Sequence, residues 1–318
     1  MTGRSSLLES FSMPPLRRVL VPGLLVLLLS GCQSVVTVPV QSILRPERTQ
    51  RESGLTPTER RWLAKNCFEG QPELTESIAG TNREVVREGY ALLHSSYFRL
   101  PLWVSEGLDR RQFVGGEDRS NKFFPDPSLP KEERSELKDY RLSGFDRGHQ
   151  APAGDFSASK KLKDDSFSLA NMAPQQGPGF NQDIWRWLED HARTMIEAAG
   201  RGYIITGPMF YDADEEPGSA HADGLVNVRW IGKGRVAVPT HFYKIVITFD
   251  GDTPRCVAFV LENRKYPHAL RYDFRTYVKT VDWIEARTGL NFMPELAPNQ
   301  EKALERVEGS IDSLPPTS

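Results

Sequence analysis

The sequence has few cysteines and no grouping of cysteine with histidine. Its 318 residues include three cysteines, Cys32, Cys67 and Cys256, and no pair of them has the Cys-x-x-Cys spacing. A structural zinc site needs four thiol or imidazole ligands held close together. The sequence therefore offers no such site. It also contains no internal repeat and no long low-complexity tract, which argues against a repeat protein.

The sequence also lacks an excess of positive charge. It has 40 basic and 42 acidic residues, a net charge of −2. Residues 1–31 hold three of the basic residues and one acidic residue, so the chain without them carries −4. A protein that coats or stores DNA is expected to be basic. The charge therefore argues against a coat protein, whereas an enzyme that releases its product needs only a local positive cleft.

A hydrophobic run near the N-terminus is too short to span a membrane. Residues 19–29 are apolar, follow Arg17 and Arg18, and lead into Leu29-Ser30-Gly31-Cys32. A basic segment, a short apolar segment and small residues are typical of a secretory signal peptide. The ending resembles the lipobox of bacterial lipoproteins, which implies cleavage before Cys32 and lipid attachment there. Gln33 then implies sorting to the outer membrane. The alternative is an ordinary signal peptide.

Composition and pattern predict one domain of enzyme size with tails. Residues 1–31 would be the signal peptide, 32–58 a polar tether with little regular structure, 59–300 the domain, and 301–318 a tail that begins as a helix. Cys67 and Cys256 could form a disulfide in an oxidising compartment. Cys256 lies in an apolar, strand-like run, so a packed free thiol is an equally open alternative.

Strands and helices are expected without regular alternation. Runs rich in β-branched and aromatic residues predict strands at residues 97–102, 202–206, 242–249 and 257–261. Helical spacing of apolar residues predicts helices at residues 82–93, 182–199 and 280–288, with Trp185 and Trp187 in the core. This mixture indicates an α+β fold with an antiparallel sheet.

The stretch Asp146-Arg147-Gly148-His149 carries candidates for phosphodiester chemistry. An imidazole titrates near neutral pH, so His149 can take a proton from water. The guanidinium of Arg147 is a permanently charged fork that matches phosphate oxygens. Gly148 leaves out a side chain where backbone and substrate would come close.

A second group of candidates lies on the predicted helix that follows. Asn181 is placed at its start, where an amide is a favoured cap. Glu189 and Arg193 follow eight and twelve positions later, so all three are expected near one face. An amide oxygen and a carboxylate suit Mg²⁺, which keeps most of its waters and accepts few protein ligands. The alternative is that Glu189 and Arg193 form only an exposed ion pair.

Three ordered motifs resemble a known family. Asp-Arg-Gly-His, then Asn171-x-Ala-Pro-Gln, then Asn181-Gln-x-x-Trp-x-x-Leu-Glu resemble the DNA/RNA non-specific endonucleases, a ββα-metal (His-Me finger) group that includes endonuclease G. The resemblance runs over roughly residues 85–296. It implies a central antiparallel sheet and a metal-bearing unit made of two strands and a helix.

The resemblance also implies a role for each motif residue. His149 would be the general base and Asn181 the one direct protein ligand of Mg²⁺, for which Mn²⁺ is a possible substitute. Glu189 would hold metal-bound waters. Arg147 and Arg193 would contact substrate phosphate, and Arg119 aligns less securely with another arginine of the family. Asn171 and Asp146 would support the pocket.

These implications define a function and its alternatives. The chain is expected to be a lipid-anchored, Mg²⁺-dependent endonuclease that cleaves DNA and RNA to products with a 5′-phosphate. It would lie at the bacterial outer membrane, in the periplasm or at the cell surface. One alternative is a catalytically idle lipoprotein that binds nucleic acid. Another is a phosphodiesterase of narrower substrate, for example RNA or cell-wall phosphodiesters. The sequence does not indicate the oligomeric state.

Overall fold

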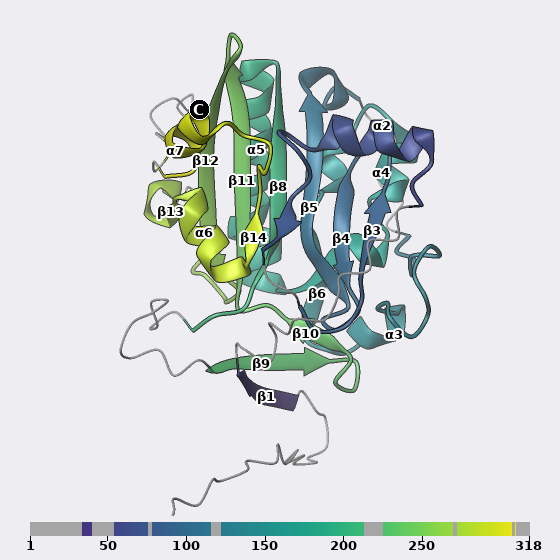
Figure 1. The fold of residues 1–318 in the computed structure, drawn as a ribbon. Coiled ribbons are helices and arrows are strands. Elements are labelled where there is room, and N and C mark those ends of the chain that lie inside the picture. The colour runs from purple at the N-terminus through teal and green to yellow at the C-terminus, as the bar shows by residue number, and fades with distance from the viewer. Residues whose placement is uncertain are drawn as a thin grey trace, which may run out of the picture. The chain divides into compact units, whose positions relative to one another are not determined.

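The computed structural model describes residues 34–39, 54–75, 78–115, 122–212, 225–269, 272–306 and 309, all within one compact unit, Cys32–Ser318. Its centre is a seven-stranded antiparallel sheet with the order β13-β12-β11-β8-β5-β4-β3 (Figure 1). In that order the strands are Val278–Lys279, Thr253–Glu262, His241–Asp250, Arg201–Met209, Leu100–Asp109, Ala91–Ser95 and Asn82–Val86. Smaller sheets pair β1, β9 and β10 (Ser34–Pro39, Leu225–Ile231, Val236–Val238), β14 with β2 (Leu290–Asn291, Glu73–Leu74), and β6 with β7 (Phe145–His149, Met172–Gln176). The expected α+β class with a central antiparallel sheet is confirmed.

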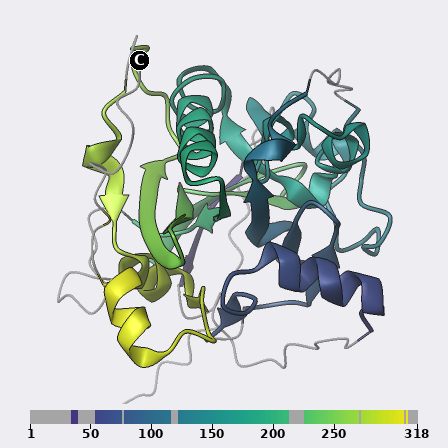
Figure 2. The same ribbon diagram turned by 90° about the horizontal axis from the view of Figure 1, so that it is seen from above.

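Helices cover both faces of the central sheet, as Figures 1 and 2 show. Helix α5 (Trp185–Ala199) lies on one face, and α2 (Pro57–Asn66) and α6 (Val281–Thr288) lie on the other. Successive residues of β5 therefore face different helices. A side chain at Gly107 would collide with the Lys65 carbonyl of α2, while the neighbouring Glu106 interacts with Glu189 and Arg193 of α5. The remaining helices are short: α3 (Leu137–Tyr140), α4 (Lys160–Asp165), α7 (Pro298–Leu304), η1 (Arg110–Gln112), η2 (Ala153–Phe156), η3 (Leu169–Asn171) and η5 (Phe274–Tyr277).

Local sequence explains where several helices begin. Thr56 caps α2 by accepting a hydrogen bond from the Glu59 amide, and the Glu59 carboxylate accepts one from the Thr56 amide in return. This reciprocal arrangement satisfies amides that have no partner inside the helix. Thr280 caps α6 by accepting from the Trp283 amide. Trp185 of α5 is fully buried, as expected, and Trp187 is half-buried.

The helix predicted at residues 82–93 is wrong. These residues form strands β3 and β4, which pair with each other in a hairpin that places Glu84 opposite Leu93. The Arg87 amide donates to the Tyr90 carbonyl across the turn. β4 also pairs with β5, so this segment has backbone partners on a strand outside it. Tertiary pairing therefore overrides the local apolar spacing.

The segment expected to be a tether contains a strand. Ser34–Pro39 forms β1, which pairs antiparallel with β9 from Ser34 opposite Trp230 to Pro39 opposite Leu225. The run Val35-Val36-Thr37-Val38 is β-branched, and an unpaired edge of β9 supplies the hydrogen-bonding partners. At the other end, α7 extends across the predicted boundary at residue 300.

Several sequence-based expectations concern residues outside the described ranges, namely the signal peptide, Cys32 and Arg119. No helix in the described part of the chain combines the length and the apolar character needed to cross a membrane. Cys67 and Cys256 are both free thiols, and burial raises the pKa of each to about 12. The disulfide alternative is therefore wrong for this structure.

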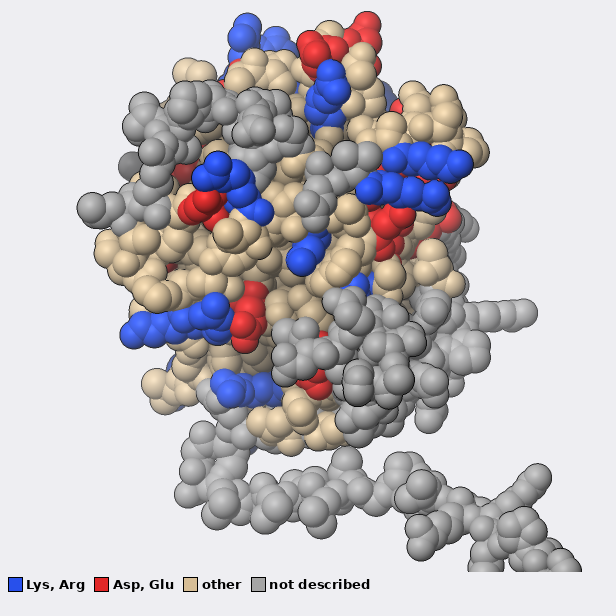
Figure 3. All heavy atoms as spheres, turned by 90° about the vertical axis from the view of Figure 1, so that its left-hand side faces the viewer, with Lys and Arg blue, Asp and Glu red and all other residues tan. Residues whose placement is uncertain are grey.

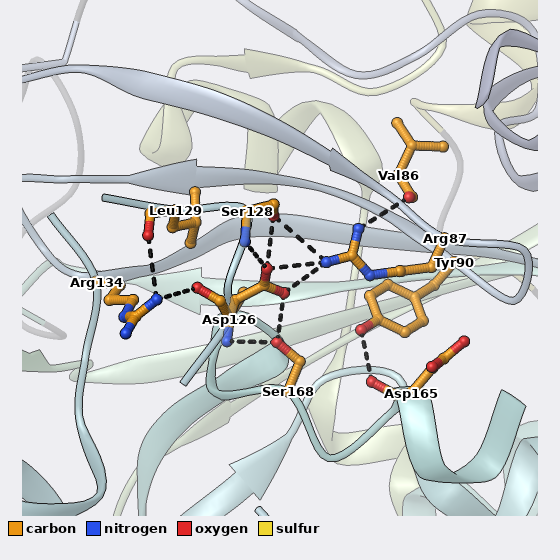
Figure 4. Close-up of polar contacts among 10 residues, drawn as sticks. Val86, Arg87, Tyr90, Asp126, Ser128, Leu129, Arg134, Asp165 and Ser168 are labelled. Atoms are coloured by element: carbon orange, nitrogen blue, oxygen red, sulfur yellow. Dashed lines mark hydrogen bonds and ion pairs between the residues drawn. The ribbon is translucent and has the colours of Figure 1, made fainter. Parts of the chain in front are cut away.

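A buried carboxylate ties together the segments that lead to the candidate site (Figure 4). Asp126, fully buried, accepts hydrogen bonds from Arg87 Nη2 at 2.8 Å and from the Ser168 hydroxyl at 2.6 Å. The backbone amide of Ser128 donates to the same carboxylate at 2.9 Å. Burial acts to raise the pKa of Asp126, but Arg87 and these donors outweigh it and hold the pKa below its usual value. Strand β3, the loop at Asp126 and the start of η3 are thereby joined.

Candidate active site

Two short strands present the Asp-Arg-Gly-His motif. β6 pairs with β7 so that Asp146 lies opposite Gln175 and His149 opposite Met172. A side chain at Gly148 would lie 2.0 Å from Gln175 Oε1, and Gln175 is fully buried. The expectation that Gly148 makes room for substrate is therefore wrong. The space is taken by Gln175, and glycine is needed so that the two strands can pair around that side chain.

His149 is the last residue of β6 and is only 8% exposed. Its ring meets Phe167 edge to face, with the ring centres 5.0 Å apart, and lies 5.7 Å from the ring of Phe123. These aromatic neighbours limit the orientations of the imidazole. Phe123 also carries the guanidinium of Arg147 at 4.1 Å from its ring centre. One aromatic side chain thus positions both motif residues.

The helix predicted at residues 182–199 begins later than expected. Gly177–Ile184 forms an irregular, π-helical stretch with non-helical backbone angles at Pro178, Gly179 and Asp183, and α5 begins at Trp185. Asn181 is therefore not the cap of α5, and no side chain caps that helix. Gly179 has φ 86°, and a side chain there would collide with the Tyr266 backbone. The close approach of Gly179 to the Tyr266 backbone therefore accounts for the irregular stretch before α5.

Asn181 is held by Asp146. Its Nδ2 donates to Asp146 Oδ2 at 2.9 Å, and Gln182 Nε2 donates to the same oxygen at 2.8 Å. A carboxylate only accepts hydrogen bonds, so the amide nitrogen of Asn181 must face it. The amide oxygen Oδ1 is then the atom available to a cation.

Asn171 supports the chain directly after His149. Its Nδ2 donates to the carbonyls of Ala151 and Ser166 at 2.8 and 2.9 Å, and its Oδ1 accepts from the Ala151 amide at 2.9 Å. Asn171 is fully buried. Its hydrogen bonds go to the backbone, and it does not line the cavity.

Helix α5 brings Glu189 and Arg193 to the same side as Asn181. Burial raises the pKa of Glu189 to about 7. Lys244 and Arg193 act against this, and Asp155 and Asp190 act with it. The Nε of Arg193 donates to the buried Asp155 at 2.8 Å, and its Nη1 donates to Asp190 at 2.6 Å. The alternative of a simple Glu189–Arg193 ion pair does not occur, because Arg193 pairs with other carboxylates.

A layer of buried charge behind α5 carries no sequence motif and was not predicted. Lys244 of β11 is 1% exposed, donates to the Thr206 hydroxyl at 2.7 Å and lies 5.2 Å from the ring centre of Trp185. Burial lowers its pKa, although Glu189 and Glu106 act to raise it. Both carboxylate oxygens of Glu106 lack a hydrogen-bond partner in the described structure, and burial raises its pKa well above the usual value. A buried lysine therefore lies close enough to Glu189 to interact with its carboxylate.

The candidate residues share one cavity of about 1060 Å³. Its lining includes six residues predicted from sequence: Asp146, Arg147, His149, Asn181, Glu189 and Arg193. It also includes two exposed arginines that were not predicted, Arg141 and Arg186. Neither belongs to a motif, so only proximity identifies them. The remaining predicted arginine, Arg119, lies outside the described residues.

The donors in this cavity suit a hard divalent cation. Asn181 offers an amide oxygen and Glu189 a carboxylate, and such oxygens are the usual ligands of Mg²⁺, Mn²⁺ and Ca²⁺. None of the residues that line the described cavity is a cysteine, so a soft metal is disfavoured. Asp146 orients the amide from behind, as residues behind a metal ligand commonly do.

Comparison with known proteins places the chain in a family. The family model described as DNA/RNA non-specific endonuclease matches residues 69–299. Nuclease C1 from Cunninghamella echinulata var. echinulata is 38% identical over 68% of this chain and 85% of its own length. Mitochondrial endonuclease G from Homo sapiens is 36% identical over 66% of this chain and 69% of its own length. A crystal structure of an EndoG/EndoGI complex matches with a TM-score of 0.65 and 31% identity, covering 77% of this chain and 96% of that chain. The chain is thus a phosphodiester-hydrolysing enzyme of the ββα-metal fold, and it belongs to the DNA/RNA non-specific endonuclease family.

Proposed function

We propose that this protein is a Mg²⁺-dependent endonuclease that cleaves both DNA and RNA, with His149 as general base. The observation that carries the proposal is the convergence of His149, the Asp146-held Asn181 and Glu189 on one cavity. A base, an oxygen ligand for a hard cation and a second carboxylate are what hydrolysis of a phosphodiester requires.

The proposed reaction is an in-line attack of water on phosphorus. His149 takes a proton from the attacking water. The sugar 3′-oxygen leaves and takes up a proton from solvent, giving a 3′-hydroxyl and a 5′-phosphate. Arg147, which makes no ion pair with any described residue, holds the phosphate and offsets its developing negative charge. Asn181 and Glu189 would hold the divalent ion, which supplies charge stabilisation of the phosphate and of the leaving oxygen.

The other arginines are assigned supporting roles. Arg193 is already paired with Asp155 and Asp190. We therefore assign it to positioning these carboxylates beside Glu189 rather than to a single phosphate contact. Arg141 and Arg186 add positive charge along the cavity. Arg119 keeps its proposed contact with phosphate, which rests on the family resemblance.

Four arginines line the cavity beside three carboxylates, so groups that can bind phosphate are concentrated there although the whole chain has a net charge of −2. Away from the cavity the charge is mixed. Figure 3 shows Lys and Arg lying beside Asp and Glu on the face formed by the left-hand side of Figure 1. Such mixing favours release of product, because affinity for nucleic acid rises with the number of phosphates neutralised.

The wild-type protein on defined substrates tests the proposal. We expect it to cleave plasmid DNA, single-stranded DNA and RNA in Mg²⁺, to be inactive with a chelator, and to recover with Mg²⁺ or Mn²⁺. Labelled ends of the products should carry a 5′-phosphate. Binding without cleavage would instead support the idle nucleic-acid-binding lipoprotein. Cleavage of RNA or cell-wall phosphodiesters alone would support the narrower phosphodiesterase.

We also propose a location at the bacterial outer membrane, through lipid on Cys32. Ser34, the first residue that the structure describes, pairs with Trp230 in β9. Replacing Cys32 with Ser should abolish labelling by radioactive palmitate and block signal cleavage at that position. Persistent labelling, or a mature protein that begins elsewhere, would contradict the anchor.

A further inference from the structure

Leu142 occupies a backbone position that ordinarily belongs to glycine. The Ser143 amide donates to the Tyr140 carbonyl at 3.2 Å, which closes a turn over Tyr140–Ser143. Arg141 has φ −63° and ψ 123°, and Leu142 has φ 58°. These angles correspond to a type II turn, whose third residue needs positive φ and is therefore usually Gly or Asn. A leucine there strains the backbone, because its Cβ crowds the following carbonyl oxygen.

Packing within the chain does not offset this strain. The Leu142 side chain is 93% exposed, the highest value among the exposed large hydrophobic residues that the structure describes. A left-handed leucine that contacts almost nothing is unfavourable for folding. Residues with strained backbone angles are enriched at functional sites.

The location of Leu142 indicates what the side chain meets. Leu142 lines the same cavity as His149, on the segment that leads directly into β6. Leu137 is 41% exposed and lines the cavity as well. Arg141, beside Leu142, is exposed and makes no ion pair with any residue in the described ranges. The guanidinium of Arg141 could bind a phosphate of a partner, and the exposed side chains of Leu142 and Leu137 could contact apolar groups beside that phosphate.

We propose that Leu142 is a substrate-binding residue, which packs against the bases and sugars next to the phosphate at His149 while Arg141 holds an adjacent phosphate. This inference rests on the proposed function, since it takes nucleic acid as the substrate. Nucleic acid has both features, charged phosphates and apolar base faces and edges, and apolar side chains contact the latter in known complexes. Leu142 then contributes to affinity for polymers and not to the chemical step.

Substitutions at Leu142 separate the backbone effect from the side-chain effect. Leu142→Gly and Leu142→Asn both suit positive φ and both remove the apolar contact, whereas Leu142→Met keeps it. The matched control is Lys233→Gly. Lys233 is also exposed and has φ 62°, but it lies in the turn between β9 and β10, outside the cavity lining. All glycine and asparagine variants should melt at or above the parent temperature, which excludes misfolding as an explanation.

The binding measurement uses the full chain with His149→Ala, so that a fluorescent duplex is not cleaved in Mg²⁺. We expect Leu142→Gly and Leu142→Asn to weaken binding about 10-fold, and Leu142→Met and Lys233→Gly to bind like the parent. With His149 restored, KM for plasmid should rise by a similar factor at nearly constant kcat.

Three results would overturn the proposal. The first is equal duplex affinity for Leu142→Gly and Lys233→Gly. The second is a fall in kcat at unchanged KM, which would mean that Leu142 shapes the cavity. The third is unchanged affinity with a changed sedimentation coefficient, which would assign Leu142 to a contact between copies. If wild-type protein cleaved none of the substrates, the proposed function would fail instead.

Discussion

Asn181 and Glu189 are expected to serve the metal in different ways. Asn181 is bonded through its amide nitrogen to Asp146, so its oxygen alone is available for direct coordination. Glu189 lies on α5 and is expected to act through metal-bound water. Direct ligands determine whether the ion binds, whereas groups that hold its waters determine how well the bound ion acts.

Substitutions at Asn181 and Glu189 should therefore affect Mg²⁺ binding and cleavage rate differently. Asn181→Ala should bind Mg²⁺ weakly and recover only part of its activity at high Mg²⁺. Glu189→Gln should still bind Mg²⁺ but cleave slowly at saturation. The measurements are Mg²⁺ binding by calorimetry and cleavage rate against Mg²⁺ concentration, with circular dichroism as the folding control. Wild-type metal response in Asn181→Ala would remove Asn181 from the metal site.

The raised pKa of Glu189 predicts a pH-dependent response to metal. Burial sets this pKa at about 7 in the metal-free protein. Above pH 7 the carboxylate is ionised and can hold metal-bound water, and below pH 7 it is increasingly protonated and cannot. The Mg²⁺ concentration for half-maximal cleavage should therefore rise as the pH falls from 8 to 6. Glu189→Gln should show little of this rise, and an equal rise in both proteins would assign the effect to another group.

The site residues that sequence could predict are those with neighbouring partners in the chain. Asp146, Arg147 and His149 lie within four positions, and Asn181 and Glu189 follow in one short segment. Lys244, Glu106 and Arg186 could not be predicted. Lys244 and Glu106 reach α5 only through the order of strands in the sheet, and an exposed arginine without a motif has no distinguishing pattern.

At the scale of elements, the network at Asp126 is expected to hold the aromatic wall of the site in place. Phe123 and Phe167 contact His149, and each lies within three residues of a member of that network. The side chain of Asp126 is completely buried, and that of Arg87 is 24% exposed. Removing one partner of a buried ion pair leaves uncompensated charge, which costs about 3–5 kcal/mol.

Asp126→Ala should lower the free energy of unfolding by about 3–5 kcal/mol for that reason. Urea denaturation followed by circular dichroism measures it. The control is Asp252→Ala at the turn between β11 and β12, where Asp252 pairs with Arg201 on the surface at 3.4 Å. Exposed pairs contribute little, so this variant should unfold like the parent. Similar losses in both variants would show that burial of Asp126 is not the cause.

Secondary structure was predictable where local pattern and tertiary pairing agree. The runs at residues 242–249 and 257–261 lie within β11 and β12, and residues 280–288 contain α6. The apolar spacing at residues 82–93 favours a helix. Its actual strand structure depends on pairing of β4 with β5, which comes later in the chain and which local spacing does not reveal. The start of α5 was misplaced because the bend depends on Gly179 packing against the Tyr266 backbone, far along the sequence.

For the whole molecule, residues 34–39 are joined to the domain by strand pairing. β1 completes a sheet with β9 and β10, although about 190 residues separate the paired strands in the sequence, as in the Thr37–Asn227 hydrogen bond. Sequence shows the β-branched run but not its distant partner. Overall composition likewise gives a net charge of −2 and hides the arginines gathered at one cavity.

The rate of a single turnover by His149→Ala tests the central assignment most directly. Loss of a general base should lower plasmid cleavage at least ~100-fold at saturating Mg²⁺, with the circular dichroism spectrum of the folded protein retained. The control is His268→Ala, whose side chain is 74% exposed and pairs with Asp183 outside the cavity lining. That variant should cleave like the parent. A folded His149→Ala protein that cleaves within twofold of the parent would contradict the assignment of His149 as the base.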